Sequence, residues 1–92
     1  PAELEGLLLE HDGVADCAVI GKPDERSGEI PKAFVVRAAG SSVDGEELMS
    51  FIAERVATFK QIREIEFIDA IPKNPSGKIL RRVLVEQERA QA

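Results

Sequence analysis

Apolar positions along the chain repeat with two different spacings, which predict alternating helices and strands. In residues 1–11, Leu4, Leu7, Leu8 and His11 share one face of a helix, and Pro1 suits the first helical position. Residues 14–21 and 32–38 are rich in small and β-branched residues, which favours strands. A third such run covers residues 63–71, so three short strands are expected.

The clearest helical pattern covers residues 42–59. Asp44 can cap this helix, and Glu47, three residues later, completes a capping box. Its stripe follows the spacing of one helix face and consists of Leu48, Phe51, Ile52, Arg55, Val56 and Phe59. A last helix is expected over residues 79–92, with its inner side formed by Ile79, Val83 and Leu84.

The segments between these elements are short. Asp12 and Gly13 end the first helix, residues 22–31 read as a polar loop, and residues 72–78 read as a turn. The run Phe34-Val35-Val36 indicates a strand buried on both faces. The order helix, strand, strand, helix, strand, turn, helix predicts one α+β domain over residues 1–92, in which about three helices pack on a small layer of short strands.

Composition narrows the function classes. The chain is 43% hydrophobic, which supports a folded core, and it has no apolar run near the roughly 20 residues that a membrane span needs. Trp and Tyr are absent, and the isoelectric point is about 4.9, which argues against nucleic-acid binding. Cys17 is the only cysteine, which excludes an internal disulfide and fits a reducing cytosol, and its apolar neighbours predict a small core residue.

Charge is distributed unevenly. Residues 1–59 carry five Lys/Arg against twelve Asp/Glu, whereas residues 60–82 carry six against three. A basic segment on an acidic body suggests an anionic partner for that segment, although a solvated basic surface explains the charge equally well.

Most catalytic motifs are missing. Lys78 follows Gly77 but no Walker A glycine precedes it, there is no GxGxxG, and one cysteine with one histidine predicts no metal site. The remaining candidate is Lys78, which follows a Pro-Ser-Gly turn and precedes a helix. A compact ammonium there suits phosphoryl or acyl-phosphate chemistry, while ordinary surface lysine is the alternative.

The segment "PKNPSGKILRR", residues 72–82, resembles the C-terminal signature of the adenylate-forming acyl-CoA synthetase superfamily. "PAELEGLLLEHDGVADCAVIGKPDERSGEIPKAFVV" resembles the opening of the same domain, and "FKQIREIEFIDAIPKNPSGKILRR" resembles its end. The similarity covers residues 1–85 and is greatest to 4-coumarate–CoA ligases and acyl-CoA ligases. It implies that the chain is the small mobile lid, which follows a hinge and a large ATP- and acid-binding domain that are outside this sequence.

The resemblance also implies a two-step reaction. A carboxylate attacks the α-phosphorus of ATP to give an acyl-adenylate and pyrophosphate, and the CoA thiol then displaces AMP after the lid rotates. Lys78 matches the catalytic lysine of the first step, and Ser76 and Gly77 match the turn beside the nucleotide. The roles of Lys73, Arg81 and Arg82 are left open, with solvation or ion pairing as the simpler interpretation.

A second matching region, "FKQIR", implies contacts with the CoA nucleotide. The resemblance places Phe59, Lys60 and Arg63 there, although Gln61 departs from the common cation and Phe59 also fits the apolar stripe. ATP with Mg²⁺, CoA and a carboxylic acid are the implied substrates of the complete enzyme, and its own N-terminal domain is the implied partner. The isolated domain is expected to bind none of these substrates and to be inactive.

Two other hypotheses are kept beside the ligase domain. The first is a non-catalytic binding module that retains the lid fold. The second is a small nucleic-acid binder that uses residues 60–82, and the acidic composition counts against it.

Overall fold

The computed structural model describes residues 2–91, apart from the side chain of Phe59. Pro1, the predicted helix start, and the predicted Phe59 contacts lie outside the described part. The elements follow the predicted order, which confirms the α+β fold class: α1 (Ala2–Leu9), β1 (Val14–Asp24), β2 (Gly28–Arg37), α2 (Gly45–Ala53), a single 3₁₀ turn (Thr58–Lys60), β3 (Glu64–Phe67) and α3 (Arg81–Gln91).

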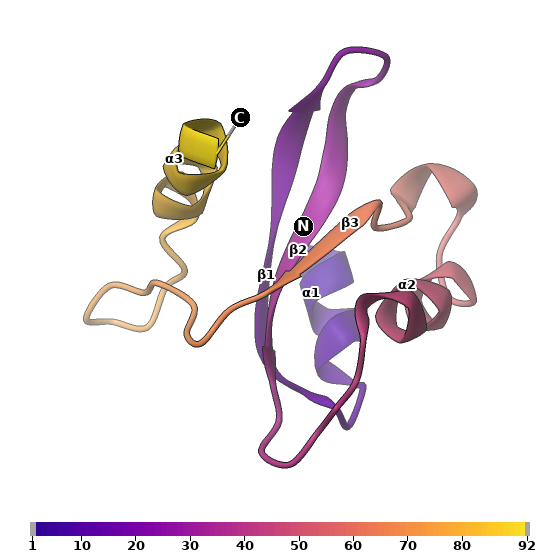
Figure 1. Ribbon diagram of the computed structural model, residues 1–92, viewed down its shortest axis with the longest axis vertical. Helices are drawn as coiled ribbons and strands as arrows, with labels where there is room; N and C mark the ends of the chain where they lie inside the picture. The colour runs from indigo at the N-terminus through magenta and orange to yellow at the C-terminus, as the bar shows by residue number, and fades with distance from the viewer. Residues whose placement is uncertain (1, 92) are drawn as a thin grey trace.

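The three strands form one sheet with β2 in the centre. β1 pairs with β2 antiparallel, and β3 pairs with the other edge of β2 in parallel. Figure 1 shows α1 and α2 packed together on one side and α3 standing apart on the other, joined to β3 by an extended loop. The sheet is therefore covered by helices on both faces.

Alternation along the strands divides the core into two clusters. Val35 belongs to the cluster under α1 and α2, while its neighbour Phe34 belongs to the cluster under α3. Leu84 of α3 is fully buried against Phe34 and Ile20. The predicted burial of β2 on both faces is thus confirmed, since successive side chains of a strand point to opposite faces.

The predicted polar loop at residues 22–31 is wrong. β1 and β2 continue as a hairpin, in which Lys22 pairs with Ile30 and Asp24 with Gly28. The Asp24 carboxylate accepts the Arg26 and Ser27 amides at 3.2 and 2.8 Å, and Gly28 has a φ of 81°, which a glycine adopts without strain. Local composition suggested a loop because the pairing that makes it a hairpin is between strands.

Several helices and strands begin or end at other residues than predicted. The helix expected over residues 42–59 ends at Ala53. Asp44 caps it by accepting the Glu47 amide at 2.8 Å, but the Glu47 carboxylate bonds to His11 and does not close the capping box. The strand expected over 63–71 covers only Glu64–Phe67, and its last pair joins Phe67 to Val35 of β2. The last helix begins at Arg81 and not at residue 79.

Two of the stripe residues predicted for α2, Leu48 and Ile52, are fully buried, and Phe51 and Val56 are partly buried. Arg55 is exposed. Its guanidinium lies 3.5 Å from the centre of the Phe51 ring, so this cation covers the edge of the core and does not enter it.

A charge cluster joins α3 to the sheet beyond the apolar contact of Leu84. One turn later, the Glu88 carboxylate lies 2.5 Å from Lys32 Nζ and 3.3 Å from Lys22 Nζ. Two glutamates of β3 bind the same two lysines: Glu64 pairs with Lys22, and Glu66 pairs with Lys32. Lys32 and Glu88 are buried, so a buried charge is paired with opposite charge on each side.

The cluster shifts the pKa values of Lys32 and Glu88. Burial alone would lower the pKa of Lys32, but its hydrogen bonds to Glu66 and Glu88 outweigh burial and raise the pKa above the usual 10.5. Hydrogen bonds from Lys32 and Lys22, in that order of importance, hold the pKa of Glu88 below the usual 4.5. Lys32 and Glu88 are therefore both charged throughout the neutral range.

This arrangement predicts an acid-sensitive attachment of α3. The folded state binds fewer protons at Glu88 than the unfolded state does, so the stabilisation is complete above pH 4.5 and is lost as the pH falls through the lower folded pKa. Urea unfolding should show a free energy that decreases below about pH 4.5. Glu88→Gln should make this decrease smaller. Glu86→Gln, an exposed position on the same helix, is the control and should leave it unchanged; equal pH profiles for Glu88→Gln and the parent chain would contradict the assignment.

Candidate functional site

The turn that carries Lys78 is a closed loop on two paired stems. Lys73 and Ile79 form an isolated antiparallel bridge, and the Leu80 amide donates to the Pro72 carbonyl at 2.9 Å. We call residues 72–80 the Lys78 turn. In Figure 1 it extends away from the sheet between β3 and α3. Its stems are therefore fixed by the same kind of pairing that holds a hairpin.

The side chain of Asn74 holds the centre of the Lys78 turn. Its Oδ1 accepts the Ser76 amide at 3.1 Å, the Ser76 hydroxyl at 2.8 Å and the Lys78 amide at 2.9 Å. The Asn74 amide in turn donates to the Lys78 carbonyl at 2.9 Å. Gly77 has a φ of 88°, which explains the glycine at this position. Both backbone polar groups of Lys78 are therefore bonded to one residue.

The side chain of Lys78 is in a different situation from its backbone. Lys78 is exposed, and within residues 2–91 its ammonium makes no hydrogen bond or ion pair. A cation whose backbone is fixed and whose charged group is unpaired is available to a ligand from outside the domain. The structure thus places the predicted residues Ser76, Gly77 and Lys78 on one loop that is closed by hydrogen bonds to Asn74.

The other cations of this segment are used differently. The Lys73 ammonium lies 2.6 Å from Asp16 Oδ2, and the Arg81 guanidinium lies 2.6 Å from both carboxylate oxygens of Glu5. Ion pairing, the simpler interpretation, is confirmed for these two. Arg82 is exposed and makes no ion pair within residues 2–91.

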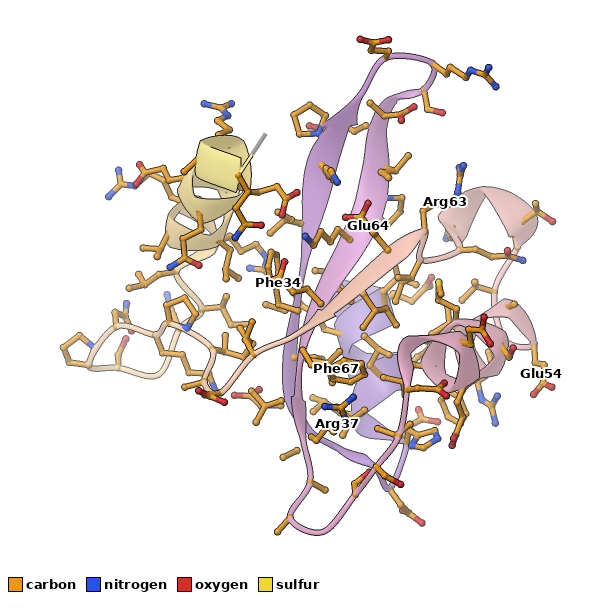
Figure 2. All side chains as sticks on the ribbon, viewed as in Figure 1. Phe34, Arg37, Glu54, Arg63, Glu64 and Phe67 are labelled. Carbon is orange, nitrogen blue, oxygen red and sulfur yellow. The ribbon has the colours of Figure 1, made fainter. Side chains whose placement is uncertain are left out.

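The residues predicted to contact CoA lie elsewhere. Figure 2 shows Arg63 at the start of β3, on the opposite side of the sheet from the Lys78 turn. Arg63 is exposed and lines a hollow of about 310 Å³ together with Ser27, Glu29, Ile30, Pro31, Thr58 and Gln61. The ammonium of Lys60 lies 3.5 Å from Glu3 and faces a separate hollow between α1 and the end of α2. The structure does not place Lys60 and Arg63 in one cavity.

The remaining candidates behave as structural residues. Cys17 is 2% exposed, and burial, helped by the charge of Glu5, raises the pKa of its thiol to about 12, so it is a core residue as predicted. Among the described residues there is no cluster of three or more His, Cys, Asp or Glu side chains that could hold a metal ion. No helix in residues 2–91 is long and apolar enough to cross a membrane.

Sequence reasoning missed Asn74. It treated the residue as ordinary turn composition, although Asn followed by Pro with Ser two positions later is a typical Asx-turn arrangement. That signal could have identified the residue that fixes Lys78.

Comparison with known proteins gives the family. Residues 3–78 match the family described as AMP-binding enzyme C-terminal domain, and the match ends at the candidate lysine. This chain belongs to that family. Among curated relatives it is 54% identical over 87 residues to 4-coumarate--CoA ligase-like 5 of Oryza sativa subsp. japonica, covering 95% of this chain and 16% of the relative. It is 52% identical over 86 residues to Peroxisomal OPC-8:0-CoA ligase 1 of Arabidopsis thaliana, covering 94% and 16%.

Solved structures agree with the fold. The domain superposes on a Mycobacterium tuberculosis fatty acyl CoA synthetase with a TM-score of 0.91 and 42% identity, covering 99% of this chain and 18% of that one. It matches an o-succinylbenzoate CoA synthetase from Bacillus subtilis, solved with its acyl-adenylate intermediate, with a TM-score of 0.85 and 37% identity over 91% of this chain and 17% of that one. The chain thus spans less than a fifth of the proteins it resembles.

The geometry of the Lys78 turn predicts the effect of removing its central acceptor. Asn74→Ala leaves the Lys78 amide without its bond, and a typical bond contributes about 1 kcal/mol. Hydrogen exchange of the Lys78 amide, followed by NMR in the 92-residue chain, should accelerate roughly fivefold. Asn74→Asp keeps an acceptor oxygen and should leave the exchange rate near that of the parent. No change in Asn74→Ala would show that this bond does not fix the turn.

Proposed function

We propose that this chain is the C-terminal lid of an ATP-dependent acyl- or aryl-CoA ligase and that Lys78 acts in acyl-adenylate formation. The supporting observation is that the backbone N–H and C=O of Lys78 are both bonded to Asn74, while its ammonium has no partner among the residues that the structure describes. Family membership supports the same role. A fixed backbone with an open charge is what an electrostatic catalyst needs, because it requires no rearrangement when the reaction occurs.

The chemistry of the first step explains the need for this cation. The acid's carboxylate oxygen forms a bond to the α-phosphorus of ATP, and the bond from that phosphorus to the pyrophosphate oxygen breaks. Two anions must approach each other, and negative charge increases on the phosphoryl oxygens as they do. The ammonium of Lys78 would lie between the carboxylate and the α-phosphate and offset their repulsion.

The nearby turn residues have supporting roles in this proposal. Ser76 uses its hydroxyl and amide to bind Asn74, so it stabilises the turn. A Cβ added to Gly77 would meet no atom within 4 Å in this chain, so the space beside it is open to the nucleotide. We propose that Ser76 and Gly77 form the surface that the nucleotide approaches.

The second step belongs to another part of the domain. There the CoA sulfur bonds to the acyl carbon, and AMP leaves. We propose that Arg63, with Phe59 and Lys60 as further candidates, contacts the CoA nucleotide. The exposed guanidinium of Arg63 at the edge of a hollow supports this role, since guanidinium groups bind phosphate through two parallel hydrogen bonds. The separation of Lys78 from Arg63 would let one domain serve the two steps with two different surfaces.

The complete ligase is proposed to use ATP with Mg²⁺, CoA and a carboxylic acid, and this domain is proposed to work against its own N-terminal domain. By itself it would bind none of these and would be inactive. We propose a cytoplasmic location, with the peroxisome as the alternative that one relative's name raises.

The role of Lys78 predicts a selective loss. In the full-length ligase, Lys78→Ala should lower ATP–pyrophosphate exchange, measured with the best acid from a carboxylic-acid panel, by about 10²–10³. Transfer of a pre-made acyl-adenylate to CoA should change little. Lys78→Arg should rescue poorly, because the guanidinium is bulkier and planar.

Arg82→Ala is the matched control, since Arg82 is an exposed cation four residues further along. It should stay within about threefold of the parent in both steps. Equal losses of both half-reactions in Lys78→Ala would refute the assigned role. An unaffected first step would favour the alternative of a binding module that retains the lid fold.

The role of Arg63 predicts the opposite selectivity. Arg63→Ala should raise the KM for CoA roughly tenfold, because it removes a charge-assisted contact to phosphate, and should leave ATP–pyrophosphate exchange unchanged. Arg89→Ala, an exposed arginine on α3, serves as the control and should alter neither quantity. An unchanged KM in Arg63→Ala would place the CoA phosphates elsewhere.

A further inference from the structure

Two ion pairs connect the Lys78 turn to the body of the domain, one at each stem. In the first stem, before Lys78, Lys73 binds Asp16 of β1. Directly after the second stem, Arg81 binds Glu5 of α1. Lys78 lies between these two points. The position of the turn's backbone relative to the sheet is therefore constrained by Asp16 and Glu5, two carboxylates outside the turn.

The pair of Arg81 and Glu5 is the more constrained of the two. The side chain of Glu5 is 11% exposed, whereas that of Asp16 is 32% exposed. Both oxygens of Glu5 lie 2.6 Å from Arg81, and one of them also accepts the Val19 amide at 2.8 Å. The Arg81 Nε approaches the Val19 carbonyl at 3.4 Å. The two side chains thus meet both backbone groups of Val19 on β1, which is an edge strand.

This geometry leaves Arg81 little freedom. A buried carboxylate needs its cation, because a charge without a partner is costly away from water. One nitrogen of Arg81, Nη2, contacts both oxygens of Glu5, and the Nε contact to the Val19 carbonyl gives the guanidinium a second point of attachment. Arg81 is three residues after Lys78 and is the first residue of α3, so orienting it fixes the end of the turn.

We infer that Glu5 is a positioning residue for Lys78 and acts through Arg81 to hold the Lys78 turn in the place that acyl-adenylate formation requires. The inference rests on the proposed role of Lys78. Glu5 is buried in the domain's own interior and touches no substrate in this assignment. Its effect on the reaction is indirect, and it should be confined to the step in which Lys78 takes part.

The test is a double-mutant comparison in the full-length ligase, using Glu5→Gln, Lys78→Ala and the two combined. Glu5→Gln keeps an acceptor for the Val19 amide but removes the charge that holds Arg81. It should lower ATP–pyrophosphate exchange about tenfold through kcat, since misplacing a catalytic group by about 1 Å can cost up to 10². Transfer from pre-made acyl-adenylate to CoA should be retained.

The combined variant separates positioning from a general structural role. If Glu5 acts through Lys78, then adding Glu5→Gln to Lys78→Ala should cause no further loss of exchange. A further tenfold loss in the combined variant, or an equal loss of both half-reactions in Glu5→Gln, would overturn the inference. Glu47→Gln is the control, because Glu47 bonds His11 just beyond the same helix without touching the turn, and it should leave exchange unchanged.

A replacement variant and a comparison of the two single variants complete the test. If Glu5→Gln does not fold, as judged by circular dichroism, Arg81→Lys replaces it, which keeps the charge but loses the contact of Arg81 Nε to the Val19 carbonyl. It should show the same selective loss, and full activity would overturn the inference. If Lys78→Ala has no effect on exchange while Glu5→Gln does, the proposed function of Lys78 fails; if only Lys78→Ala has an effect, the positioning role fails.

Discussion

The central strand β2 must be covered on both faces, and this requirement determines the arrangement of the domain. Phe34 and Val35 are adjacent and point in opposite directions, so each face of the sheet needs a helix layer. α1 and α2 supply one layer before β3 is reached. The chain must then pass to the other face to place Leu84 of α3 against Phe34. The Lys78 turn lies on this passage, so burying the core places the candidate site at the edge of the sheet.

Charged residues hold that passage where the apolar contacts end. Lys32 and Glu88 fix one end of α3, and Glu5 and Arg81 fix the other. Each carboxylate is buried beside a strand, where an unpaired charge would be costly, so each needs a cation beside it. The ammonium of Lys78, like the guanidinium of Arg82, has no ion-pair partner in residues 2–91, but Lys78 also has both of its backbone polar groups bonded to Asn74. A domain that pairs its buried charges but leaves this cation open fits an electrostatic role in a reaction between two anions.

Local sequence patterns predicted the features that depend on residues close together in the chain. These are the order of elements, the Asp44 cap, the buried Leu48 and the single turn that contains Ser76, Gly77 and Lys78. They could not predict the hairpin at residues 22–31, since pairing between strands overrides a polar composition. They also could not predict the partner of Arg81, because Glu5 lies at the other end of the chain. The predicted CoA residues were placed by resemblance, and the domain does not bring Lys60 and Arg63 into one hollow.

The most direct test concerns the rigidity of the Lys78 turn, since a mobile turn could not present a fixed charge. Relaxation of ¹⁵N nuclei in the 92-residue chain gives an order parameter for each backbone amide. The amides of Asn74, Ser76, Gly77 and Lys78 should have order parameters of about 0.85, the value of rigid backbone. Values below about 0.6 at Ser76 to Lys78, with rigid strands beside them, would contradict the proposal that this turn holds a pre-positioned catalytic lysine.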